Sequence, residues 1–174
     1  MKLRRPALPS VRPAFARPLF VAALAALVAV GAGCDGQRLQ ESFAAAARRS
    51  PSGITRTNAQ GAASETDADD WRTAPVYAGR VRIDPAFPNP AAQGRFVSVS
   101  VGVLDFDGTQ GGLSLHAYDP GGRLRVLTTQ RVDGPGTYVL SFGASQLGRV
   151  GLTRVFVLDG RGEIISYGDV EVLG

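Results

Sequence analysis

From residue 76 to the C-terminal end, apolar and polar residues alternate in short runs, with turn-forming residues between them. In the clearest run, four valines share one side of a strand and three small residues share the other. These are Val97, Val99, Val101 and Val103 against Ser98, Ser100 and Gly102. A period of two residues is typical of a strand with one buried face. The pattern predicts strands over residues 76–84, 95–106, 112–119, 122–131, 136–142, 152–159 and 163–173.

No long segment of this region repeats with the 3.6-residue period of a helix. Seven short strands in about 100 residues are typical of an immunoglobulin-like sandwich of two antiparallel sheets. We therefore predict an all-β fold, with one such sandwich over residues 71–174. A domain of this size buries roughly 60–70% of the surface of its unfolded chain, which is enough for an independent core.

Two of the turns share one pattern of residues. Tyr118–Leu124 and Leu158–Ile164 both read apolar, Asp, two turn residues, Gly, a charged residue and apolar. An aspartate accepts hydrogen bonds from the backbone of such a turn, and glycine takes the position with positive φ. Each pattern therefore predicts a tight hairpin.

The segment from Leu115 to Phe142 combines one of these turns with the alternating run GPGTYVLSF. This segment resembles the central hairpin of bacterial immunoglobulin-like and fibronectin-like modules. The resemblance implies a sandwich fold and an accessory or adhesive role. It carries over no catalytic residue, because such modules generally have none.

The N-terminal region has the three parts of an export signal. A basic head precedes an uncharged run of 16 residues, Pro18 to Gly33, and the only cysteine follows at Cys34. Ala32 and Gly33 before the cysteine resemble the lipobox of bacterial lipoproteins, although Gly31 stands where leucine is usual. Two alternatives are cleavage at an Ala-x-Ala-like site and an uncleaved anchor, but the run is shorter than the ~20 residues of a spanning helix.

The lipoprotein resemblance implies that residues 1–33 are a removed signal peptide and that Cys34 carries the lipid. The expected location is the cell membrane or the outer membrane, with the domain outside the cytoplasm, in the periplasm or on the cell surface. The expected partners are the membrane, through the lipid on Cys34, and an envelope protein or polysaccharide.

Residues 34–70 are predicted to be the lipidated N-terminus and a flexible tether. Residues 37–49 have the pattern of a short, marginal helix, and Ser50 to Asp70 is polar, with Ile54 as its one large aliphatic residue. Such a segment buries too little apolar surface to offset the entropy of ordering it. Its acidic end, Asp67, Asp69 and Asp70, has the composition of a calcium cluster, but a solvated linker is the preferred interpretation.

The formal charge of +4 does not describe the predicted mature protein. Five of the 19 basic residues lie in the first 17 positions, which leaves 14 against 15 acidic residues, a net charge of −1. This balance argues against nucleic acid as a partner. With Cys34 lipidated, no thiol remains for a disulfide or for a cysteine-based metal site.

Few residues offer chemistry. His116 is the only histidine, and strand parity places it opposite Leu115, on an outer face. Asp105 and Asp107 form half of a calcium loop and are weak metal candidates, because no third ligand or closing glutamate follows. Residues 143–149 imitate a phosphate-binding loop, but a short helical turn is preferred. We expect no catalytic residue, no cofactor and no assigned metal site.

The aromatic residues supply a last set of candidates, for a carbohydrate-binding platform. They are Trp71, Tyr77, Phe87, Tyr118 and Tyr167. The sequence favours a non-catalytic, lipid-anchored binding or structural module of the envelope. The alternative is an envelope hydrolase or a calcium-dependent carbohydrate-binding module that uses the loops near Asp105 and Asp119.

Overall fold

The computed structural model describes residues 35–105 and 107–174, so the predicted signal peptide and Cys34 lie outside the described residues. The chain divides into two compact units, residues 1–38 and 39–174, and the fold below is that of the second unit. A helix covers residues 35–47. The remaining elements are β1 (Arg56–Thr57), β2 (Ala63–Glu65), η1 (Pro75–Tyr77), β3 (Val81–Ile83), β4 (Ala91–Ala92), β5 (Phe96–Val103), β6 (Gly112–Tyr118), β7 (Leu124–Arg131), β8 (Gly136–Gly143), η2 (Ala144–Leu147), β9 (Gly151–Asp159) and β10 (Ile164–Leu173).

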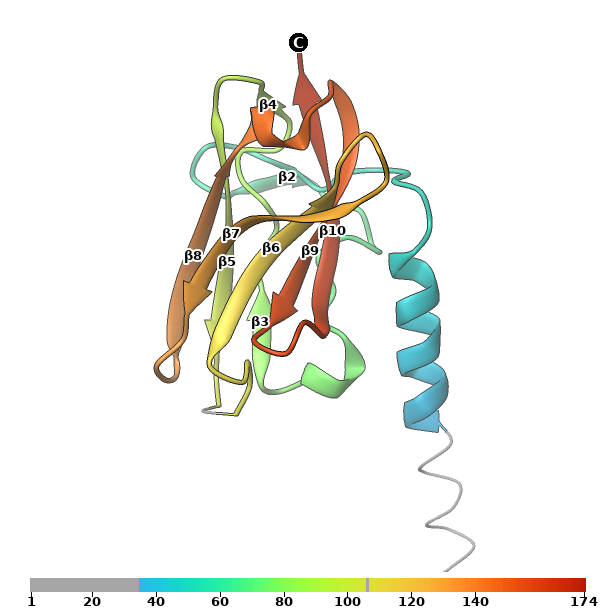
Figure 1. Ribbon diagram of the computed structural model, residues 1–174, viewed down its shortest axis with the longest axis vertical. Helices are drawn as coiled ribbons and strands as arrows, with labels where there is room; N and C mark the ends of the chain where they lie inside the picture. Colours follow the sequence, from blue (N-terminus) through green and yellow to red (C-terminus); the bar gives the residue numbers. More distant parts are fainter. Residues whose placement is uncertain (1–34, 106) are drawn as a thin grey trace, which may run out of the picture. The chain divides into compact units, whose positions relative to one another are not determined.

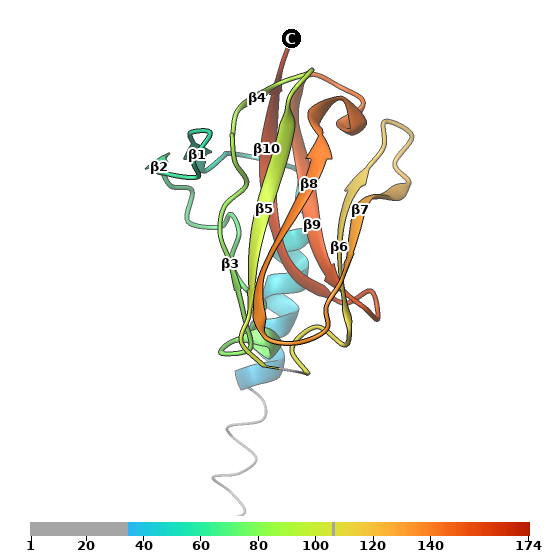
Figure 2. The same ribbon diagram turned by 90° about the vertical axis from the view of Figure 1, so that its left-hand side faces the viewer.

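Two sheets lie face to face around one core. The larger sheet has the order β4-β10-β9-β6-β7, the smaller has the order β3-β5-β8, and β1 and β2 form a separate hairpin. All pairs are antiparallel except β10 with β4, which is parallel. Figure 2 shows β5 and β8 in front of β9 and β10. Buried apolar residues of both sheets form a single cluster, so the architecture is sandwich-like.

The predicted all-β character is confirmed, and each of the seven predicted ranges contains a strand. The structure also has three strands of two or three residues, β1, β2 and β4, which the prediction lacks. Strands this short give no readable alternation, because two residues cannot show a period of two. The count of seven strands is therefore not confirmed.

The two predicted hairpins are present, as the β6–β7 and β9–β10 turns. In the first, Asp119 accepts a hydrogen bond from the Arg123 backbone at 2.9 Å. In the second, Asp159 accepts bonds from the backbones of Arg161 and Glu163 at 2.8 and 2.9 Å. Gly122 and Gly162 occupy the positive-φ positions, at 78° and 86°. The predicted helical turn over 143–149 is η2.

The segment predicted to be a flexible tether is packed against the sandwich from residue 39 onward. Phe43 is 6% exposed and Ala47 is 1% exposed. The Phe43 ring lies 5.2 Å from the Tyr167 ring, on the outer face of β10. Figure 1 shows the helix alongside this sheet. Within the predicted tether, the helix is thus packed through Phe43 and Ala47, and Thr55, Thr57 and Asp70 are buried as well. Residues 58–60 and 62–66 are exposed.

Candidate functional site

The most buried charged cluster of the second unit joins the N-terminal segment to the larger sheet. Arg154 on β9 forms a two-pronged ion pair with Asp169 on β10, with Nε–Oδ1 and Nη2–Oδ2 distances of 2.7 and 2.8 Å. The remaining nitrogen, Nη1, donates to the carbonyls of Ala46 and Arg49 at 2.9 and 2.8 Å. These are carbonyls that the end of a helix leaves without partners. Arg154 therefore caps the helix while it neutralises Asp169.

Asp70 extends this cluster along β10. Its two carboxyl oxygens accept bonds from the Thr55 and Asp169 backbones at 2.8 and 2.9 Å. Burial raises the pKa of Asp70 to about 7, although the two backbone bonds oppose the shift. Both oxygens are thus committed to backbone groups, and the carboxyl serves to attach residue 55 to β10. We assign this cluster a structural role.

The acidic residues singled out in the sequence do not assemble into a metal site. Asp105 and Asp107 are both exposed and flank residue 106, which lies outside the described residues. The Asp119 carboxylate accepts a hydrogen bond from the Arg123 backbone in the β6–β7 turn. The Asp67 carboxyl hydrogen-bonds to Asp69, which raises the pKa of Asp67 and lowers the pKa of Asp69. Within residues 35–105 and 107–174, no three His, Cys, Asp or Glu side chains are grouped to hold a metal ion.

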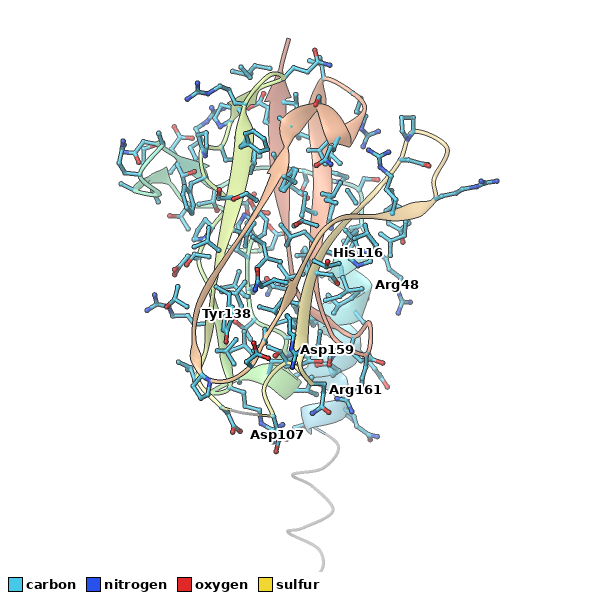
Figure 3. The ribbon with its side chains drawn as sticks, turned by 60° about the vertical axis from the view of Figure 1, so that its left-hand side comes forward. Arg48, Asp107, His116, Tyr138, Asp159 and Arg161 are labelled. Carbon is cyan, nitrogen blue, oxygen red and sulfur yellow. The ribbon has the colours of Figure 1, made fainter. Side chains whose placement is uncertain are left out.

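His116 lies on the outer face of the larger sheet, as predicted from its parity with Leu115. One ring nitrogen, Nε2, lies 2.9 Å from the Ser114 hydroxyl. Burial lowers the pKa of His116, because a partly dry site disfavours the charged ring. Figure 3 shows His116 well above Asp159 and Asp107, so the histidine and these carboxylates do not share a site.

A tyrosine–carboxylate contact lies at the other end of β9. The Tyr77 hydroxyl donates to Asp159 at 2.9 Å. Burial and this bond raise the pKa of Tyr77 to about 12. The same Asp159 carboxylate orders the β9–β10 turn through the Arg161 and Glu163 backbones. The contact therefore joins η1 to the turn and keeps the phenol protonated.

The structure separates the aromatic candidates by exposure. Trp71, Tyr77 and Tyr167 are buried and belong to the core. Tyr118 is 48% exposed and packs edge-on against Phe156, with 5.6 Å between ring centroids. Tyr118 and Tyr77 each line a hollow elsewhere on the surface, whereas Phe87 lines one together with the exposed ring of Phe96.

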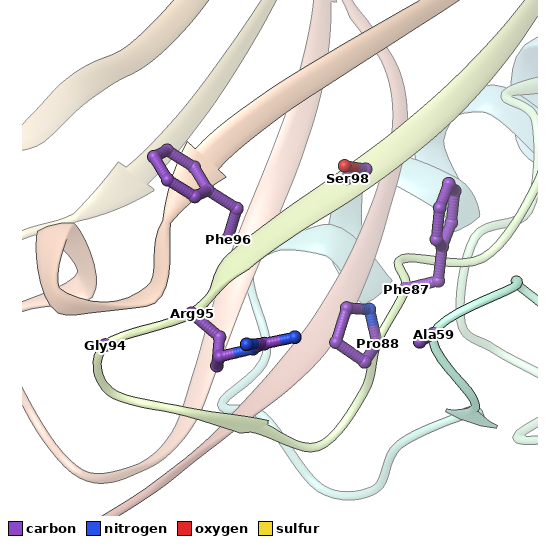
Figure 4. Close-up of a pocket in the computed structure, with 7 residues that line it drawn as sticks. All are labelled: Ala59, Phe87, Pro88, Gly94, Arg95, Phe96 and Ser98. Atoms are coloured by element: carbon purple, nitrogen blue, oxygen red, sulfur yellow. The ribbon is translucent and has the colours of Figure 1, made fainter.

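This hollow, which we call the aromatic hollow, has a volume of about 400 Å³. It is lined by Ala59, Phe87, Pro88, Gly94, Arg95, Phe96 and Ser98. Reciprocal backbone bonds of 2.8 Å between Phe87 and Ser98 hold the two sides together. In Figure 4 the Arg95 side chain extends toward Pro88, with the rings of Phe96 and Phe87 on either side and Ser98 between them.

The charge of the hollow comes from Arg95. Among the ion pairs within the described ranges, none involves this guanidinium. Phe96, the next residue of the chain, is 71% exposed, the highest value among the exposed large apolar residues of the described chain. An exposed ring beside an unpaired planar cation can stack on an apolar surface while the cation binds an anion.

The hollow opens onto the outer face of the smaller sheet, which we call the open face. Its residues are Ser98, Ser100 and Gly102 on β5 and Thr137, Val139 and Ser141 on β8, in the pairs Ser98–Ser141, Ser100–Val139 and Gly102–Thr137. The Ser98 and Ser141 hydroxyls lie 2.8 Å apart. A second hollow of about 600 Å³ lies at the far end, where Arg82, Asp84 and Thr137 line it.

Sequence reasoning missed Arg95 and Phe96. The signal was present in the parity of β5, because Phe96 falls in phase with Ser98 and Ser100 and out of phase with the valines. An aromatic residue on the polar side of an alternating strand is exposed unless another element covers it. Residue type alone does not separate Phe96 from the aromatic residues of the core, whereas its position on the strand does.

No protein-family model matches the chain, and no curated protein matches its sequence. In the part of the chain that the structure describes, no helix is both long enough and apolar enough to cross a membrane.

Proposed function

We propose that this chain is a lipid-anchored, non-catalytic binding module of the bacterial cell envelope, with the aromatic hollow as its contact site. The observation that carries the proposal is the lining of the hollow. Phe96 is 71% exposed there, and Arg95 takes part in none of the ion pairs of the described residues.

The immunoglobulin-like assignment is supported by the order of the strands. The ladder β10-β9-β6-β7 faces the sheet β3-β5-β8, so the chain passes between the two sheets several times. Such crossings between two antiparallel sheets are typical of the Greek-key sandwiches of immunoglobulin-like and fibronectin-like modules. Modules of this kind serve many functions, so the function must be argued from the site.

Contacts of the helix within the second unit show where this unit begins. The Gln40 side chain accepts a bond from the Val76 backbone in η1 at 3.4 Å, while the end of the helix contacts Arg154 on β9. η1 itself lies beside the end of β5 that carries Val103, through the bond from Arg80 to Tyr77 and the bond from Leu104 to Arg80. The second unit therefore begins near the Val103 end of β5.

The aromatic hollow lies at the other end of the same strand. Phe96 is the first residue of β5 and Val103 is the last. Seven residue steps at about 3.3 Å each separate the two ends by roughly 23 Å. Lasting attachment takes two acyl chains, which a diacylglyceryl cysteine supplies.

One experiment with three proteins tests the proposal. The parent, Cys34→Ser and Phe96→Ala are expressed in a bacterium, partitioned in detergent and incubated with envelope fractions of the native host. We expect Cys34→Ser to lose the acyl mass and leave the detergent phase. We expect Phe96→Ala to stay lipidated and to bind envelope material at least about tenfold more weakly, because a central exposed ring is a typical binding hot spot.

Val126→Ala is the matched control, because Val126 is also an exposed apolar residue, at 54%, and lies on β7 of the larger sheet, away from the hollow and the open face. Unchanged mass and partitioning of Cys34→Ser would refute the anchor. Equal envelope binding by the parent and Phe96→Ala would refute the contact site.

A further inference from the structure

We propose that the open face binds an acidic polysaccharide, with one uronic acid unit seated in the aromatic hollow. This inference rests on the proposed function, since it names the partner of the same site. The ligand class follows from three features of the surface: its cation, its rings and its row of small hydroxyl residues.

The cation selects a carboxylate. The Arg95 guanidinium extends across the hollow toward Pro88 (Figure 4) and takes part in none of the ion pairs of the described chain. Its planar fork matches a carboxylate with two parallel hydrogen bonds. A single arginine pairs with one carboxylate, so only the unit seated in the hollow needs to carry a charge that the protein contacts.

The two rings select a ligand with apolar faces. Phe96 is 71% exposed, and Phe87 and Pro88 form the opposite wall. Sugar rings present flat C–H faces that pack on aromatic rings, and each such contact removes apolar surface from water. A small inorganic anion would leave both rings in water.

The row beyond the hollow selects an extended ligand. From Phe96 to Gly102, β5 spans six residue steps, or about 20 Å. Its outward side chains are small, and Thr137 and Ser141 on β8 add hydroxyls beside them. Hydroxyls can both donate and accept, which suits the hydroxyl groups of a glycan. Val139 is the only large aliphatic residue among the six of the open face, so the face lacks the apolar centre typical of a protein interface.

Direct binding tests the proposal with purified full-length protein in a neutral detergent. The probes are hexamers of mannuronate and of galacturonate, with EDTA present, and the same hexamers after reduction of their carboxylates to alcohols. We expect the parent to bind at least one acidic hexamer and to bind its reduced form about tenfold or more weakly, as expected for the loss of a charged hydrogen bond.

Variants locate the contact. Arg95→Gln keeps the length of the side chain and removes the charge, and we expect it to lose affinity to the same extent as reduction of the hexamer. Phe96→Ala should lose at least a similar factor. Arg123→Gln is the matched control, since Arg123 is an exposed arginine beside β7, on the other sheet, and should bind as the parent does.

Three outcomes would overturn the inference. The first is equal binding of acidic and reduced hexamers. The second is binding of anionic phosphatidylglycerol vesicles, dependent on Arg95, in place of the hexamers. The third is that the parent binds no hexamer while its binding to envelope material still depends on Phe96. This result would refute the acidic polysaccharide as the ligand and leave the proposed function in place. If the parent protein bound neither envelope material nor the hexamers, the proposed function would be refuted as well.

Discussion

The outer faces of the two sheets differ in what covers them. Residues 39–49 pack on the outer face of β9 and β10, where Arg154, Asp169 and Tyr167 are all at most 5% exposed. The open face of β5 and β8 carries small polar residues that are half-buried or exposed. The strand sequences differ in the same way. β5 alternates strictly, whereas β9 has an unbroken apolar run from Val155 to Leu158. Continuous apolar runs are typical of strands buried on both faces.

The polar groups of the two faces have different roles. On the covered face, charges are buried and fully paired, so they fix the position of the N-terminal segment. On the open face, hydroxyls and one guanidinium remain available to a ligand. A buried ion pair adds little net stability, yet removing one partner leaves an uncompensated charge. The two faces should therefore respond very differently to matched substitutions.

The largest expected effect comes from Arg154→Ala. Loss of the guanidinium would leave Asp169, which is 1% exposed, without its ion pair, and would release the carbonyls of Ala46 and Arg49. We expect a loss of about 3–5 kcal/mol in the free energy of unfolding, measured by urea denaturation. Arg131→Ala is the control, because Arg131 pairs with Asp133 in an exposed position and should change stability little. Similar losses in both variants would contradict the structural role of the buried pair.

A smaller difference is expected between two glycines. An added Cβ at Gly168 on β10 would lie 2.1 Å from the Trp71 indole, which is itself buried. At Gly102 on the open face, the nearest atom would be 3.7 Å away, an ordinary contact. We expect Gly168→Ala to destabilise the fold by about 1–3 kcal/mol or more through overpacking, and Gly102→Ala to be tolerated. Thermal unfolding measures both, and tolerance of Gly168→Ala would show that Trp71 is not held against β10.

A pH-dependent difference is expected from Asp70. Its pKa is raised by burial to about 7, so the folded state keeps a proton that the unfolded state releases near 3.8. The contribution of this group to stability is therefore fully present below pH 3.8 and is lost as pH rises toward 7. We expect the stability difference between the parent and Asp70→Asn to change over this range. Asp133→Asn, an exposed control, should give a flat difference, and parallel curves for all three proteins would rule out the raised pKa.

The sequence predicted the parts of this fold that local patterns encode. The valines of β5 predicted its buried face, and Asp119 and Asp159 predicted the two hairpins that the structure contains. The same parity placed His116 outside the core. The pattern indicated a marginal helix over residues 37–49 but not its attachment, which also depends on bonds from Arg154 to backbone carbonyls and on Asp70. For the candidate site, type alone identified Phe87, while Arg95 and Phe96 went unnoticed until the strand faces were known.

By itself the sequence determined the all-β character, the hairpin turns and the alternating face of β5, since each arises from residues close together in the chain. Only the tertiary structure decided that the N-terminal segment is docked and that Phe87, Arg95 and Phe96 line one hollow. The docking contact joins Arg154 to Ala46 across 108 positions of sequence. The hollow requires the segment around Phe87 to pair with β5. Contacts of this range depend on which elements the core brings together, and no local pattern records that choice.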